Sequence, residues 1–142
     1  MAIWQISFYA VERNKTIQDE DICYWEKEPA NARSIVFLTQ CESWSNDIIQ
    51  YGNDQSTCIE LFLEEQRVVE IEIRLDLRSI TNLILNDVLN YITNLDALIY
   101  YENSLIEPTI TNFKSLIVRS AAYKFCNNPL KFIDEINGSD IC

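Results

Sequence analysis

The sequence contains no histidine, and this absence removes several kinds of active site at once. Without an imidazole the chain cannot assemble a Ser-His-Asp triad, a Cys-His pair or a metal site with a histidine ligand. Glycine is almost as scarce, because Gly52 and Gly138 are the only two among 142 residues. The glycine-rich loops that cradle nucleotide phosphates and the tight turn of a nucleophile elbow are therefore excluded.

Long apolar runs and close cysteine pairs are also missing. No stretch approaches the roughly 18 apolar residues of a membrane span, and the first residues do not resemble a secretory signal. The five cysteines are widely spaced without a C-x-x-C motif, which disfavours a zinc site and favours a reducing compartment. We expect a cytoplasmic protein without membrane association, metal or cofactor, in which Cys142 ends an accessible tail.

Acidic residues outnumber basic residues two to one, which gives a net charge of −11. The imbalance is concentrated in residues 1–72, where 14 acids face 5 bases, whereas residues 73–142 hold 8 acids and 6 bases. Such a field repels nucleic acid and anionic lipid and attracts cationic partners. Solubility alone is the alternative explanation for an acidic composition, and it stays open.

The chain length and the apolar pattern predict one α+β domain over residues 1–142. We expect a mostly antiparallel sheet of about five strands, packed on one face by two long helices and a short C-terminal helix. The predicted strands are Ile3–Val11, Ser34–Thr39, Thr57–Leu63, Arg67–Arg78 and Ala97–Tyr101, with a further short strand near Ile22–Trp25. The predicted helices are Ile80–Leu95, capped by Ser79, then Thr109–Phe125 and Leu130–Ile136.

The clearest pattern is a hairpin of Thr57–Leu63 and Arg67–Arg78 around a Glu64-Glu65-Gln66 loop. Opposing Leu61 to Val69 brings the apolar residues of both strands onto one face, whereas a slip of one residue would turn one apolar set to water. In this register Glu60 lies opposite Glu70.

The outward face of this hairpin carries the candidate binding residues, Glu60, Glu70, Glu72 and Asp76. Like charges opposed across a ladder are unfavourable by roughly 0.2–1 kcal/mol. We interpret them as an acidic patch for the lysines or arginines of a partner, with a merely solvated face as the alternative. A catalytic carboxylate pair is disfavoured, because it needs a desolvated carboxyl and this face is predicted to be open.

A second acidic cluster, Asp19, Glu20 and Asp21, lies on the long loop Glu12–Arg33. It lacks the turn glycine and the alternating ligands of a calcium loop. We assign it as a second contact zone for the partner if the fold brings it to the hairpin. Tyr24 and Trp25 would then serve as aromatic anchors if they are exposed.

Two stretches carry a resemblance to a known group of proteins. They are Ile71-Glu-Ile-Arg-Leu-Asp-Leu-Arg78 before a helix and Ser120-Ala-Ala-Tyr-Lys-Phe-Cys-Asn-Asn-Pro129 near the end. Together they resemble small single-domain bacterial proteins, some of which are similar to immunity proteins of toxin–immunity systems. The resemblance implies a bacterial cytosolic protein without catalytic activity, and it transfers no functional residue.

These observations favour a non-enzymatic, acidic protein-binding domain whose partner is a basic protein, an immunity-type inhibitor of a toxin being the concrete form. One alternative is a small enzyme or ligand-binding domain with a pocket between the sheet and the helices. Another is a structural subunit that buries an apolar surface in an oligomer. The identity of the partner and the oligomeric state stay open.

Overall fold

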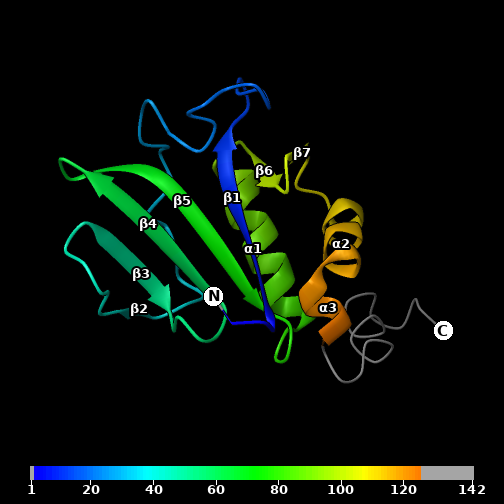
Figure 1. Cartoon of the computed structure of the whole chain (residues 1–142). Helices are drawn as coiled ribbons and strands as arrows, with labels where there is room; N and C mark the ends of the chain where they lie inside the picture. Colours follow the sequence, from blue (N-terminus) through cyan, green and yellow to red (C-terminus); the bar gives the residue numbers. More distant parts are fainter. Residues whose placement is uncertain (1, 126–142) are drawn as a thin grey trace.

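In the computed structural model, which describes residues 2–125, seven antiparallel strands form one sheet (Figure 1). The strands are β1 (Gln5–Glu12), β2 (Gln40–Cys41), β3 (Ile48–Gly52), β4 (Cys58–Glu64), β5 (Arg67–Asp76), β6 (Ala97–Tyr101) and β7 (Ser104–Ile106). Their order in space is β2-β3-β4-β5-β1-β6-β7, so the N-terminal strand is inserted between β5 and β6. The α+β class and the antiparallel sheet are confirmed, whereas the expected number of about five strands is wrong.

The first helix, α1 (Asn82–Asn94), begins two residues later than predicted. Its N-cap is Thr81, whose hydroxyl accepts a hydrogen bond from the Ile84 N–H at 3.2 Å, in the usual manner of a capping side chain. The predicted cap, Ser79, instead donates its hydroxyl to the Asp76 carboxylate at 3.1 Å. Because Ser79 is bound to Asp76 at the end of β5, the next residue with a capping hydroxyl, Thr81, begins the helix.

The predicted second long helix is divided into α2 (Ile110–Arg119) and α3 (Ala121–Phe125). The break is Ser120, which has an extended backbone with ψ of 151°. Its hydroxyl donates to the Ile117 carbonyl at 2.6 Å and accepts from the Tyr123 N–H at 3.1 Å. Serine competes for backbone groups in this way, which explains why a periodic apolar pattern did not produce one continuous helix. The predicted helix Leu130–Ile136 lies outside the described residues.

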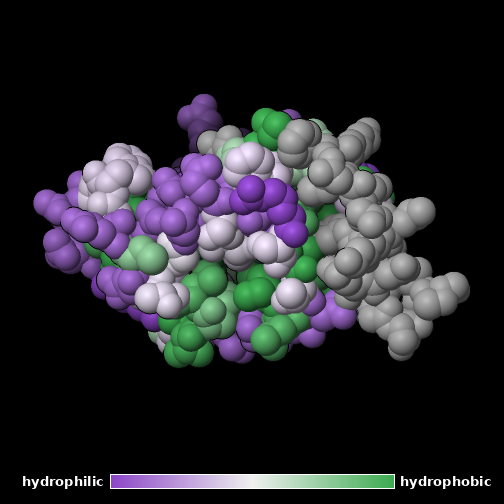
Figure 2. Space-filling model, turned by 90° about the horizontal axis from the view of Figure 1, so that it is seen from below, coloured by the Kyte–Doolittle hydropathy of each residue, from purple (hydrophilic) through white to green (hydrophobic). Residues whose placement is uncertain are grey.

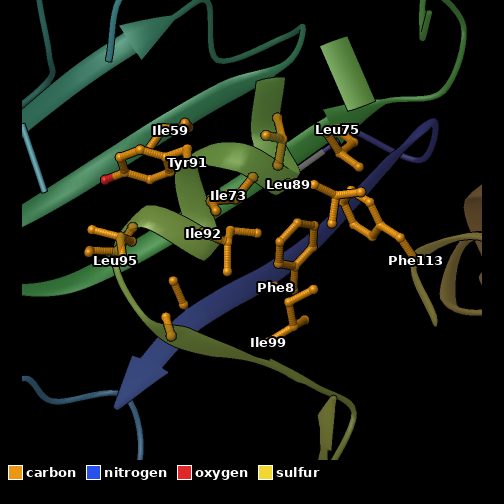
Figure 3. Packing of buried hydrophobic residues seen from close by; sticks show 14 of the residues in the cluster. Phe8, Ile59, Ile73, Leu75, Leu89, Tyr91, Ile92, Leu95, Ile99 and Phe113 are labelled. Atoms are coloured by element: carbon orange, nitrogen blue, oxygen red, sulfur yellow. The ribbon is translucent and has the colours of Figure 1, made fainter. Parts of the chain in front are cut away.

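The core lies between α1, α2 and one face of the sheet (Figure 3). The inner face of α1 is buried and packs with apolar side chains of β1, β4, β5 and β6, among them Phe8, Ile59, Ile73, Leu75 and Ile99. The four asparagines on the opposite side of α1 are exposed, as their spacing predicts. Two apolar residues of the helices, Leu83 and Ile110, are not buried in this core but are 70% and 39% exposed.

The β4–β5 hairpin has a tighter turn than predicted. Glu65 and Gln66 form a two-residue turn with φ of 51° and 67°, the left-handed pair that suits a hairpin of this length. A bulge follows between Phe62 and Leu63. Together they place Glu60 opposite Glu72 and not opposite Glu70. The shift of two positions leaves Glu60, Glu70 and Glu72 on the predicted outer face, because faces alternate with a period of two. At the bulge the faces do change, since Val68 and not Val69 belongs to the core cluster.

The segment between β1 and β2 is part of the core and contains neither of the short strands predicted at Ile22–Trp25 and Ser34–Thr39. Trp25 is only 6% exposed, and its indole N–H donates to the Ala10 carbonyl at 2.9 Å. Ala32 and Ile35 belong to the same core cluster, and the Tyr91 hydroxyl donates to the Ala32 carbonyl at 2.6 Å. The expectation of Trp25 as an exposed anchor is therefore wrong.

Candidate functional site: the outer face and the acidic tip

The face of the sheet turned away from α1, here called the outer face, carries the hairpin residues chosen from the sequence. Arg74 occupies its centre: one guanidinium nitrogen forms an ion pair with a Glu60 carboxylate oxygen and lies 3.7 Å from Glu72. The Ser7 hydroxyl on β1 donates to the other Glu72 oxygen at 2.6 Å. The structure thus brings Glu60 and Glu72 together, but it bridges them with the chain's own cation.

Glu60 is too deeply buried to meet a partner. It is 1% exposed, and one of its carboxylate oxygens has no hydrogen-bond partner within the described residues. A buried carboxylate persists only when a cation compensates it, and Arg74, 16% exposed in its side chain, supplies that compensation. The prediction of Glu60 as an exposed binding residue is wrong.

Asp76 is also buried, and its carboxylate binds the residues that follow β5. Its carboxylate accepts from the Arg78 backbone N–H at 2.9 Å and from the Arg78 guanidinium at 3.1 Å. The same guanidinium lies 3.8 Å over the ring of Trp4. At 3% exposure Asp76 has little surface to offer, so its placement in an open acidic patch is wrong as well.

Glu70 and Glu72 remain partly exposed and create a strongly electronegative zone on the outer face. Burial and then the Glu72 charge raise the pKa of Glu70. Burial, followed by the charges of Glu72 and Glu70, raises the pKa of Tyr9 to about 12. Burial and the same two carboxylates raise the pKa of the Cys23 thiol to about 11, which suppresses its reactive thiolate form.

Replacing Glu70 with glutamine is expected to stabilise the protein at pH 7 and to have no effect below about pH 4. The folded state raises the pKa of this carboxyl above its ordinary value of 4.5, so the contribution of Glu70 to wild-type stability falls as the pH rises through 4.5 toward the folded pKa. Glutamine carries no charge and avoids that loss. Thermal unfolding of Glu70→Gln across a pH series measures it, with the exposed Glu26→Gln as control. A wild-type melting temperature equal to that of Glu70→Gln at pH 7 would refute the prediction.

The Asp19–Asp21 cluster is only partly available to a partner. The Asp19 carboxylate accepts from the Thr16 N–H at 2.6 Å, and Asp21 lies 3.3 Å from the Lys15 ammonium. Glu20 is exposed. Because Glu70 and Glu72 act on the nearby Cys23, the loop that carries these acids reaches the outer face just beyond the cluster.

A second acidic region lies at one end of the sheet, where the β2–β3 loop meets the β4–β5 turn. The two are adjacent because the Leu63 N–H donates to the Asp47 carbonyl at 2.7 Å. Five exposed residues define this region, which we call the acidic tip: Glu42, Trp44, Asp47, Glu64 and Glu65. Hydrophilic residues dominate this end of the molecule in Figure 2, and both connections lie at the left of Figure 1.

Sequence reasoning missed the acidic tip, although a signal for it was present. Residues 34–66 contain six acids and no lysine or arginine. Among the described residues, none of the four tip carboxylates has a salt bridge, in contrast to Glu60, Asp76 and Asp21. A long run without bases predicts unpaired acids, because the cations that neutralise surface carboxylates often come from neighbouring positions.

A groove of about 510 Å³ can be compared with the pocket expected for an enzyme. It lies between the long loop and the end of α1, and its lining includes Trp25, Glu28 and Asp96. The Arg33 guanidinium holds the pKa of Glu28 below its usual value, and the Asp96 side chain is 88% exposed. A general acid needs a raised pKa, whereas the pKa of Glu28 is lowered, so Glu28 is not suited to that role.

Comparison with known proteins found no matching family model, no matching curated protein and no matching solved structure. Within residues 2–125, no helix combines the length and the apolar character needed to cross a bilayer. The same part of the chain holds no group of three or more His, Cys, Asp or Glu arranged to bind a metal ion.

Proposed function

We propose that this chain is a non-enzymatic, cytoplasmic protein-binding domain whose acidic tip engages a basic protein partner. An immunity-type inhibitor of a bacterial toxin is the concrete form of this proposal, in keeping with the resemblance of two of its stretches. The supporting observation is the tip itself, where four exposed carboxylates lie together without a counter-ion among the described residues.

Unpaired carboxylates at one end of a molecule do little for its own stability, but they serve association well. Clustered charges of one sign attract an oppositely charged protein and accelerate encounter by about 10- to 1000-fold at low salt. They also select against acidic or nucleic-acid competitors, because like charges repel. For a basic enzyme whose groove binds phosphates, the carboxylates of the acidic tip carry the same negative charge as the phosphates of its substrate.

The outer face takes a supporting part in this proposal. Glu70, Glu72 and Glu20 keep surface that a large partner can reach, and they add to the negative potential. Glu60 and Asp76 contribute through the fold alone, because Arg74 and Arg78 already pair with them. The binding residues assigned from the sequence therefore divide into a partly exposed group and a structural group.

Reversing the tip charges is expected to abolish capture of the partner. The test uses immobilised wild-type chain and a variant carrying Glu42→Lys, Asp47→Lys, Glu64→Lys and Glu65→Lys, each exposed to extract of the source cells. We expect the wild type to retain a basic protein that salt releases, and the purified partner to associate about 10- to 1000-fold more slowly with the variant at low salt.

The control for this experiment reverses acids elsewhere on the surface. Glu26 and Glu102 are exposed and lie outside the tip, so Glu26→Lys with Glu102→Lys changes the net charge without changing the tip. This variant is expected to keep most of the association rate. Capture of the same protein by the tip variant and the wild type, at equal rates, would refute the proposed function.

A further inference from the structure

Trp44 is the exposed aromatic residue of the acidic tip. It lies on the β2–β3 loop and is 76% exposed, more than any other aromatic side chain among the described hydrophobic residues. Isolated exposed apolar residues are common, but tryptophan is the side chain most enriched at binding hot spots. Its position between Glu42 and Asp47 on the same loop gives it an unusual electrostatic setting.

The two neighbours of Trp44, Ser43 and Ser45, fix the backbone of its loop by hydrogen bonds. The Ser43 hydroxyl donates to the Ile48 carbonyl at 2.6 Å, and the Ser45 hydroxyl accepts from the Asp47 N–H at 3.2 Å. The Ile48 N–H donates to the Ser45 carbonyl at 3.3 Å. Because the backbone on both sides is tied down, binding through Trp44 would order little additional chain.

The two arginines near the tip are occupied elsewhere. Arg33 pairs with Glu28 and donates to the Gln66 carbonyl at 2.7 Å. Arg67 donates to the Trp25 carbonyl at 2.7 Å and to the Tyr24 hydroxyl at 2.6 Å. Within residues 2–125 no cation lies over the Trp44 ring, since the cation–ring contacts are those of Tyr24 and Trp4.

A contact elsewhere in the chain shows how a tryptophan ring can bind an arginine side chain. At the opposite end of β5, the Arg78 guanidinium lies 3.8 Å over Trp4 while its N–H groups donate to the Asp76 carboxylate at 3.1 Å. A planar guanidinium can stack on an aromatic face and bind carboxylates along its edge at the same time, which an ammonium cannot do. The tip carries the same residue types, an exposed tryptophan and carboxylates on one short loop, without an arginine.

We infer that the acidic tip is an arginine-selective docking surface: Trp44 stacks on an arginine of a basic protein partner, and Glu42 and Asp47 bind its guanidinium. This inference rests on the proposed function and specifies the residue type through which the partner is held. Lysine-rich partners would be attracted by the same charge but would gain less from the ring.

The test compares labelled octa-arginine and octa-lysine peptides by fluorescence anisotropy with the intact chain. We expect wild type to prefer octa-arginine, and Trp44→Ala to weaken octa-arginine binding about 3- to 30-fold and octa-lysine binding by a smaller factor. Glu42→Lys with Asp47→Lys should weaken both peptides. Leu83→Ala removes another highly exposed apolar side chain and should change neither.

The possible results distinguish arginine selection from the proposed function on which it rests. Equal, salt-sensitive binding of both peptides by wild type, unchanged in Trp44→Ala, would overturn arginine selection and leave the electrostatic function standing. Binding of neither peptide would overturn both. Light scattering that shows a dimer dissociated by Trp44→Ala would also overturn the inference, because the ring would then be occupied by a second copy of the chain.

Discussion

Replacing Arg74 with methionine is expected to destabilise the protein by roughly 3 kcal/mol, the lower end of the range for breaking a buried ion pair. Methionine fills a similar volume but leaves the Glu60 carboxylate, 1% exposed, without its cation. The lower end applies because the Arg74 side chain is 16% exposed, so some water can reach the vacated position. Urea unfolding at pH 7, followed by circular dichroism, measures the loss.

A second substitution in the same background tests the cause. In the double variant Arg74→Met with Glu60→Leu, no buried charge remains, and replacing a whole ion pair by apolar side chains is often neutral or stabilising. Its stability should return close to that of the wild type. If the double variant were as unstable as Arg74→Met, the loss would come from packing and not from the abandoned carboxylate.

This result would also decide how to interpret the acids of the outer face. A carboxylate that the fold needs paired cannot release its arginine to a partner without a similar loss of free energy. Glu60 and Asp76 are therefore components of the sheet, and the charge available for binding lies at the acidic tip and on the partly exposed Glu70 and Glu72. Net charge alone does not reveal this division.

The sequence was informative where one strong pattern determines the structure. The faces of β4 and β5 follow from alternation, and Ala97–Tyr101 coincides with β6. The hairpin register was misjudged because Glu65 and Gln66 adopt left-handed conformations that lack the usual glycine or asparagine signal. The outer face was still the correct face for Glu60, but the residue opposite Glu60 in the ladder was predicted wrongly. The residues around a carboxylate determine whether its charge is paired.

The missed elements are those that tertiary contacts create. β2 has two residues and β7 has three, which is too short for a periodic pattern. The burial of Trp25 depends on a hydrogen bond to Ala10, 15 residues away. The exposure of Trp44 depends on a loop closed by serines. A tryptophan in a polar segment fits either outcome, so the two indoles were indistinguishable before the fold was seen.

Truncating Phe113 to alanine is expected to cost about 3–5 kcal/mol, as for other fully buried phenylalanines. The ring is 0% exposed and meets Phe8 of β1 edge to face, with centroids 5.5 Å apart and an interplanar angle of 87° (Figure 3). The fold identifies Phe8 as the partner through which Phe113 joins α2 to β1.

Urea unfolding measures the effect of Phe113→Ala, and the same helix provides its control. Ile110 lies one turn earlier on α2 and is 39% exposed, so Ile110→Ala should change stability by about 0.5 kcal/mol or less. A loss below about 1 kcal/mol for Phe113→Ala would mean that α2 is not seated on β1. Because α2 lies at the right of Figure 1 and the connections of the acidic tip lie at its left, a folded Phe113→Ala chain should still bind octa-arginine. This result would separate loss of stability from loss of the binding surface.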